Sequence, residues 1–122
     1  MSQNNCALLV VAHGSRRAAS NDEVRQLAEM MAAKAGSRFT MVVPAFLELA
    51  TPSIPDGIEH CIQTGASEVV VLPYFLSAGR HVAEDIPAEV GIKRQQYPHI
   101  PISIAAYMGS DEGVADLMLG LV

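Results

Sequence analysis

Two histidines and one glutamate stand where short apolar segments of the sequence end. His13 directly follows one apolar run, Glu48 closes a second, and His81 comes shortly after a third. Two neutral imidazoles and a carboxylate suit a borderline divalent ion such as cobalt, nickel, iron or zinc. A permanent structural zinc site usually fills four positions, often with thiolates, whereas Cys6 and Cys61 stand elsewhere in the chain. The set therefore predicts a weak, under-filled site that a metal ion can enter and leave.

Each of these residues also has a structural interpretation when it is taken alone. His13 can simply hydrogen-bond nearby backbone groups, and Glu48 can be a solvated residue at a loop end. The loop from Ser77 to Glu84 is longer than a common βα connection of about 2 to 6 residues, which favours a function for His81 within it. The conjunction of the three side chains supports a site more strongly than any one of them.

The chain alternates short apolar runs, typical of buried strands, with segments of helical periodicity. A capping box of Ser20 and Glu23 predicts the start of the first helix, and Ser53 that of the second. Asp85 and Ser110 begin the third and fourth. This alternation predicts an α/β fold, a four-stranded parallel sheet with helices on both faces. The expected strands span 6–12, 39–47, 68–75 and 100–106, and the expected helices span 20–35, 53–64, 85–96 and 110–121.

Pro44 fixes the expected order of the strands. A proline within a central strand would remove a hydrogen bond of the ladder, so the second strand belongs at an edge, which fits the order 2-1-3-4. In open parallel sheets, ligands bind beyond the carboxyl ends of the strands, near the point where strand order reverses. The three side chains described above all follow strand ends at that edge. The other two histidines, His60 in a helix and His99 before the fourth strand, do not.

Composition narrows the class of protein. The 122 residues, 50% of them hydrophobic, suit one compact domain over 1–122 with a substantial core, and exclude an intrinsically disordered chain. A net charge of −5 without a basic stripe argues against nucleic-acid binding. No apolar run approaches a membrane span, and no basic region precedes one as in a secretory signal. Because the two cysteines are isolated, we expect free thiols in a reducing compartment, which is the cytoplasm. Because no apolar run is long enough to span a membrane, we expect no membrane partner.

Three sequence blocks surround His13, Glu48 and His81. They are Val10-Val11-Ala12-His13-Gly14-Ser15-Arg16, then Ala45-Phe46-Leu47-Glu48-Leu49-Ala50 with Pro52, then Val71-Leu72-Pro73-Tyr74-Phe75-Leu76 with Gly79, His81 and Asp85-Ile86-Pro87. These blocks resemble the CbiX/SirB family, whose members are sirohydrochlorin cobaltochelatases and ferrochelatases. These class II chelatases insert a divalent metal into a tetrapyrrole. The resemblance covers residues 7 to about 110, with the blocks in family order and spacing. Beyond Gly109 the sequence departs from the family, since Ser110-Asp111-Glu112 replaces a histidine-proline pair.

The resemblance implies roles for these residues. His13 and His81 would bind the metal, with Glu48 beside them, and either a histidine or Glu48 would accept the pyrrole protons. Cobalt is the expected metal substrate, with nickel or iron as alternatives, and no organic cofactor is expected. Short members of the family have one domain and form homodimers, so a homodimer is implied here. The family's substrate is a polycarboxylate, which the neighbours of the two histidines would bind: Ser15, Arg16, Arg17, Ser77, Gly79 and Arg80.

Two other functions are weighed against chelation. A carrier or sensor that binds metal or tetrapyrrole without turnover would use the same residues, so the sequence separates it from an enzyme only weakly. A phosphotransfer enzyme with His13 as nucleophile would need an arginine immediately before that histidine, where this chain has Ala12. Chelation remains the preferred interpretation.

Overall fold

The computed structural model describes residues 5–122, in which strands and helices alternate as the sequence predicts. No helix among these residues has the length and apolarity to cross a membrane. The elements are β1 (Cys6–Ala12), α1 (Ala18–Ala35), a 3-10 turn η1 (Gly36–Arg38), β2 (Met41–Phe46), α2 (Ile54–Gln63), β3 (Glu68–Pro73), a π-helical turn η2 (His81–Asp85), α3 (Ile86–Gln96), β4 (Ile102–Ile104), a 3-10 turn η3 (Met108–Ser110) and α4 (Gly113–Leu119).

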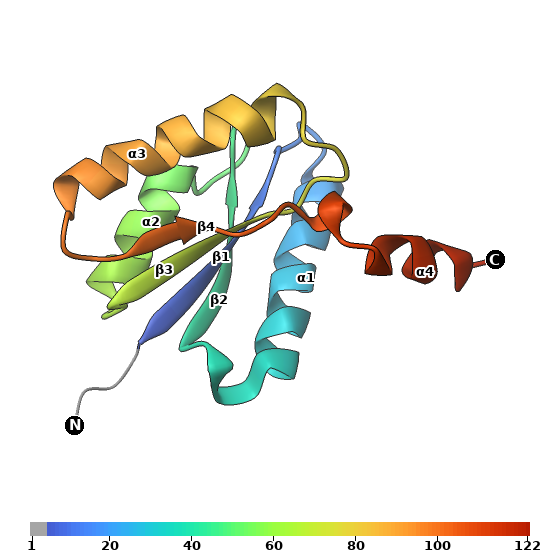
Figure 1. The fold of residues 1–122 in the computed structure, drawn as a ribbon, viewed down its shortest axis with the longest axis horizontal. Coiled ribbons are helices and arrows are strands. Elements are labelled where there is room, and N and C mark those ends of the chain that lie inside the picture. Colours follow the sequence, from blue (N-terminus) through green and yellow to red (C-terminus); the bar gives the residue numbers. More distant parts are fainter. Residues whose placement is uncertain (1–4) are drawn as a thin grey trace.

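The four strands form one parallel sheet in the order β2-β1-β3-β4 (Figure 1). This confirms the predicted fold class and strand order. Pro44 pairs in register with Val10, and its strand β2 has a neighbour on one side only. An edge strand tolerates proline because its open side needs no ladder hydrogen bond. β1 and β3 therefore lie at the centre, and the order reverses between them.

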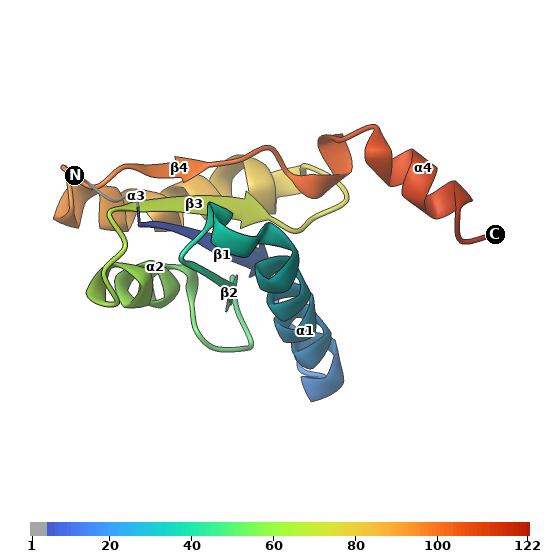
Figure 2. The same cartoon turned by 90° about the horizontal axis from the view of Figure 1, so that it is seen from below.

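The core lies on both faces of this sheet. On one face, α2 and α3 bury Ile58 and Val90 against Leu9 and Val71. On the other face α1 packs alone, with Ala28 against Leu8 and its neighbours. The last helix, α4, contributes to neither cluster, and it projects past the sheet in both views (Figure 2). The two faces are thus unequally covered.

Two of the four predicted helix starts are confirmed, and two are wrong. Ser53 caps α2, because its hydroxyl accepts a hydrogen bond from the Asp56 N–H at 3.2 Å. α1 begins at Ala18 rather than Ser20, and Arg17 occupies the cap position without a side-chain hydrogen bond. α3 begins directly after Asp85, which occupies its cap position as predicted, and the π-helical turn η2 precedes it from His81 onwards. α4 begins at Gly113, since Ser110 lies within η3.

A polar cluster joins α2 to α3. Glu59 accepts hydrogen bonds from the Lys93 ammonium at 2.9 Å, the Tyr97 hydroxyl at 2.7 Å and the Gln63 amide at 2.7 Å. Lys93 also donates to Gln96 at 2.7 Å. Lys93 is buried, so its charge needs this carboxylate partner. The cluster fixes the far end of the helical segment that begins at His81.

Candidate metal and tetrapyrrole site

The backbone places His13 beside Glu48. Past the end of the paired strands, the Leu47 N–H donates to the Ala12 carbonyl at 3.0 Å and the Glu48 N–H to the His13 carbonyl at 3.1 Å. Gly14 has a φ of +96°, and a Cβ there would lie 1.7 Å from the Glu48 carbonyl oxygen. Only glycine allows this close approach in this conformation. The two loops are therefore joined by main-chain geometry.

A buried asparagine, Asn21, fixes the loop that follows His13. Its side-chain amide accepts from the Ser15 N–H at 2.9 Å and donates to the Ser15 carbonyl at 2.8 Å. The Ser15 hydroxyl in turn accepts from the Arg17 N–H at 3.0 Å. These bonds satisfy backbone groups just ahead of α1. They also explain why the helix does not begin at Ser20: the loop is closed by Asn21 and Ser15 instead of a capping box.

His81 reaches the same place from a different element. It is the first residue of η2, and its ring centroid lies 4.7 Å from that of His13 with the ring planes tilted by 54°. The ring of Phe75, two residues past the end of β3, lies 6.2 Å from the His81 ring. The i, i+4 spacing of the turn places Asp85 against His81. A π-helical turn is a rare element that often occurs at functional sites.

Both imidazoles have one nitrogen committed and one available. His13 Nδ1 lies 3.0 Å from the Gly14 carbonyl, which can only accept, so this nitrogen carries the hydrogen. His81 Nδ1 lies 2.8 Å from Asp85 Oδ2, and an ionised carboxylate assigns it the same tautomer. Each ring therefore presents Nε2 as a lone-pair donor when neutral. Such outer hydrogen bonds are how proteins orient metal-binding histidines.

Glu48 stands next to one of these free nitrogens. Its Oε1 lies 3.4 Å from His13 Nε2. Two electron-rich atoms at this separation repel each other unless a proton or a cation lies close to both. Both side chains are half-exposed, His13 at 43% and Glu48 at 56%, so ions can reach them from solvent. The pair is a suitable place for a proton or a divalent ion.

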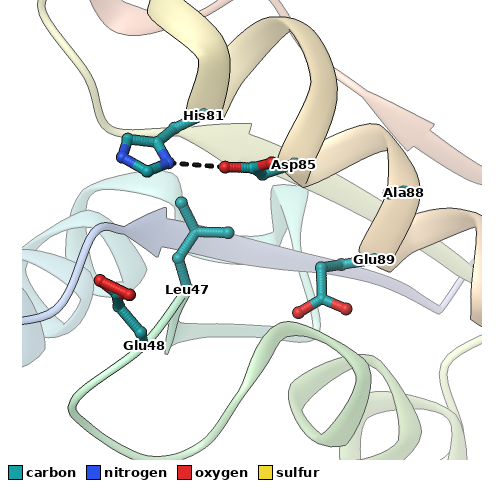
Figure 3. A pocket seen from close by; sticks show the side chains of 6 residues that line it. All are labelled: Leu47, Glu48, His81, Asp85, Ala88 and Glu89. Carbon is teal, nitrogen blue, oxygen red and sulfur yellow. Dashed lines mark hydrogen bonds and ion pairs between the residues drawn. The ribbon is translucent and has the colours of Figure 1, made fainter.

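Two hollows flank the histidines, and their chemistry differs. The first, of about 240 Å³, is lined by three carboxylates and His81, with no lysine or arginine (Figure 3). The second, of about 340 Å³, is apolar and aromatic next to His13. The first is lined by Leu47, Glu48, His81, Asp85, Ala88 and Glu89; the second by Ala12, His13, Tyr74, Phe75, Leu76 and Met108.

The structure brings some predicted residues together and leaves others apart. His13 lies near both Glu48 and His81, yet within residues 5–122 no three His, Cys, Asp or Glu side chains form a ready metal-binding group. The predicted substrate-binding residues line neither hollow. Arg16 and Arg17 are exposed, Arg80 pairs with Glu84 at 3.4 Å, and Ser77 and Gly79 lie on the exposed loop before His81.

Sequence reasoning missed two residues that shape this site. Asp85 orients His81, and its four-residue spacing from that histidine was a usable signal once the helix was extended backwards. Asn21 orients the His13 loop, and no local pattern indicates its six-residue reach to Ser15. His60 and His99 are exposed and lie outside both hollows.

Comparison with known proteins shows the family to which the chain is related. The CbiX family model matches residues 7–121. The chain is 38% identical over 111 residues to the chloroplastic sirohydrochlorin ferrochelatase of Arabidopsis thaliana, covering 91% of this chain and 48% of that protein. The crystal structure of a CbiX protein of cobalamin biosynthesis from Marinobacter aquaeolei superposes with a TM-score of 0.81 at 25% identity, covering 95% of this chain and 92% of that one.

A second solved structure carries a metal. It is the sirohydrochlorin chelatase SirB from Bacillus subtilis subspecies spizizenii in complex with cobalt, with a TM-score of 0.74 and 32% identity, over 95% of this chain and 49% of that one. The chain thus spans about half the length of the curated relatives it matches first. The family model matches nearly the whole chain and the fold agrees with that match, so the chain belongs to the CbiX family.

Proposed function

We propose that this chain inserts a divalent metal, with cobalt as first choice and iron or nickel as alternatives, into sirohydrochlorin or a related tetrapyrrole. The observation that carries the proposal is the pair of imidazoles 4.7 Å apart, each with its Nδ1 committed and its Nε2 free. Relatives are described as acting with iron and as binding cobalt. Two imidazole donors are compatible with either ion.

In this proposal the two Nε2 atoms hold the incoming ion and leave its other positions to water and the macrocycle. Insertion must release two pyrrole protons, which need an acceptor close to the ion. Glu48, 3.4 Å from His13 Nε2, is placed to take them as general base, and a histidine freed of the ion is the alternative acceptor. The chain is thus assigned two metal-holding groups and one proton acceptor.

The two hollows suggest separate approaches for the two substrates. The carboxylate-lined hollow attracts a hydrated cation, and the apolar hollow beside His13 suits the flat face of a tetrapyrrole. The macrocycle's carboxylates would extend to the exposed Arg16, Arg17 and Arg80, with the Ser15, Ser77 and Gly79 loops beneath them.

A single chain supplies one wall for a substrate of this width. We therefore propose that residues 1–122 form one chelatase-like domain, and that a second copy completes the site as a cytoplasmic homodimer.

The test is anaerobic metal insertion with sirohydrochlorin, followed by the absorbance of the macrocycle. His13→Ala and His81→Ala should each lower turnover at least about a hundredfold. His60→Ala and His99→Ala serve as matched controls and should leave it unchanged. Full activity in both site variants would contradict the proposal. Stoichiometric binding without turnover in the unsubstituted chain would instead favour a carrier, and parallel assays with cobalt, nickel and iron would rank the metals.

A further inference from the structure

The sheet face covered by α1 is left open beyond β1. α1 shields Leu8 and its neighbours, whereas Val70 and Leu72 of β3 form the floor of an open groove of about 400 Å³. The groove runs between the end of α1 and the residue after β4, Ala105. Its lining is mostly apolar and comprises Leu8, Met31, Lys34, Ala35, Arg38, Phe39, Val70, Leu72 and Ala105.

α4 presents the complementary surface. Its apolar residues recur at helical spacing and remain exposed, with Leu117 at 64%, Met118 at 58% and Leu121, just beyond the helix, at 77%. Its strongest contacts are with the turn η3 immediately before it. Figures 1 and 2 show the helix extending away from the sheet. An amphipathic helix of this kind normally buries its apolar side against a core.

The chain's own backbone holds α4 away from its own groove. The Gly109 N–H donates to the Phe75 carbonyl at 2.9 Å, and a Cβ on Gly109 would lie 1.8 Å from the Leu76 carbonyl oxygen. This close packing fixes η3 against the β3 loop and sets the direction in which the chain leaves the sheet. A further hollow, lined by Leu72, Val114 and Leu117 among others, lies at the base of α4 and shares Leu72 with the groove.

The charges of the two surfaces are opposite. The groove's only charged lining residues are Lys34 and Arg38, and neither forms an ion pair within residues 5–122. The segment from 108 to 122 has three acidic residues, Asp111, Glu112 and Asp116, and no basic one. Complementary potentials of this kind guide a helix to a groove and fix its orientation.

We propose that two copies of this chain exchange α4, the helix of each copy lying in the α1-side groove of the other. The contact is reciprocal, so it closes as a symmetric dimer without leaving a free surface. This proposal names the surfaces that form the homodimer of the proposed function, and it rests on that function because it assumes that two copies pair. The exchange also brings the partner close to the site, since Met108 in η3 lines the apolar hollow beside His13.

The test combines a measurement of the molecular mass in solution with photo-crosslinking. Light scattering of the unsubstituted chain should give a dimer. Two chains of distinguishable mass are then co-expressed, of which only one carries p-benzoylphenylalanine in place of Leu121, since Leu117 already shares a hollow with Leu72 of its own chain. Illumination should join it to groove residues such as Val70 or Leu72 of the other chain. The same photoreactive residue in place of His99, exposed in the turn before β4, is the matched control and should give no such product.

Each other outcome overturns the exchange in a distinguishable way. Crosslinks to the groove of the same chain would mean that α4 folds back on its own sheet. A dimer crosslinked outside the groove would leave the pairing and the chelatase assay standing but remove the exchange, and a monomer would remove the pairing as well.

Charge reversal provides a second measurement. Lys34→Glu with Arg38→Glu should weaken dimerisation about tenfold, and adding Asp116→Lys should restore it. Absence of restoration would count against the proposed orientation of the helix.

Discussion

The two histidines of the site are positioned by different devices. His13 directly follows the central strand β1, and it is held by backbone hydrogen bonds to the loop after β2, while the buried Asn21 of α1 fixes Ser15 in the loop that follows it. His81 sits on a π-helical turn after an exposed loop, and its ring is oriented by one side chain, Asp85. The support of His13 is part of the fold. The support of His81 is local, so the two can be disturbed separately.

The largest effect is expected from Gly14→Ala, on the His13 side. The new Cβ would lie 1.7 Å from the Glu48 carbonyl oxygen, in a backbone conformation with φ of +96°. One of the two loops must move, which should cost about 3 kcal/mol of unfolding free energy. Urea denaturation measures this loss, and cobalt titration should show a parallel loss of binding.

Gly65→Ala is the matched control for backbone strain. Gly65 has a φ of +109° but open space around its missing side chain. Its substitution should cost only the left-handed backbone penalty, about 1 to 2 kcal/mol. If the two variants lost the same unfolding free energy, the close packing of the His13 and Glu48 loops would contribute nothing to stability beyond the backbone strain.

Asn21→Ala should have the next largest effect. It leaves the N–H and the carbonyl of Ser15 without their partners in a partly buried loop, at a cost of about 1 to 3 kcal/mol. Asn21→Asp keeps an acceptor for the N–H but loses the donor to the carbonyl, so its stability should fall between the two. Thermal and urea unfolding of the three chains test this order. An aspartate variant less stable than the alanine variant would contradict it.

The sequence predicts the framework of this region better than its details. Short apolar runs and Pro44 are sufficient for the parallel sheet and its order, because burial and missing N–H groups act at each residue separately. The start of α1 was misplaced because Asn21 and Ser15 close the loop through contacts that the capping pattern of Ser20 does not encode. The residues that meet at the sheet edge follow from topology. The orientation of their rings does not.

Local sequence patterns also fail to predict how the helical segment from His81 and the last helix, α4, are positioned. A π-helical turn has no distinctive period, so the sequence predicts a loop at His81. Asp85 is correctly predicted at the start of α3, but its hydrogen bond to His81 is not predicted. For α4, periodicity identified an amphipathic helix. Its apolar side remains exposed in a single chain because the packing of Gly109 sets its direction.

On the His81 side, Asp85→Ala should change metal binding more than stability. Without the carboxylate, the His81 ring loses the hydrogen bond that selects its tautomer. Loss of such a partner of a metal-binding histidine should weaken cobalt binding by about tenfold to a hundredfold. Cobalt absorbance titrations measure the affinity, and nitrogen NMR of the imidazole reports the tautomer. Asp85→Asn, which retains an acceptor, should recover part of the affinity.

Glu89→Gln is the matched control for the charge of this hollow. Glu89 lines the same hollow as Asp85 but forms no hydrogen bond to His81 among the described contacts. It should leave the tautomer unchanged and alter affinity only slightly. A loss equal to that of Asp85→Ala would mean that the hollow acts through its total negative charge rather than through the orientation of the ring.

The smallest effect concerns the far end of α3, where the Glu59 cluster anchors the helix that begins beside His81. Hydrogen bonds from Lys93, Gln63 and Tyr97, in that order, lower the pKa of Glu59 from 4.5 to about 2. Because the folded chain favours the ionised form, this contribution to stability is present above about pH 4.5 and is lost as the pH falls towards 2. Urea midpoints measured across this range should decline less steeply in Glu59→Gln than in the unsubstituted chain, and Tyr97→Phe, which removes one donor, should lie between them.

Since this cluster is remote from both rings, cobalt affinity at neutral pH should not change. A parallel loss of affinity would show that His81 depends on the whole of α3, and its support would then be part of the fold as it is for His13.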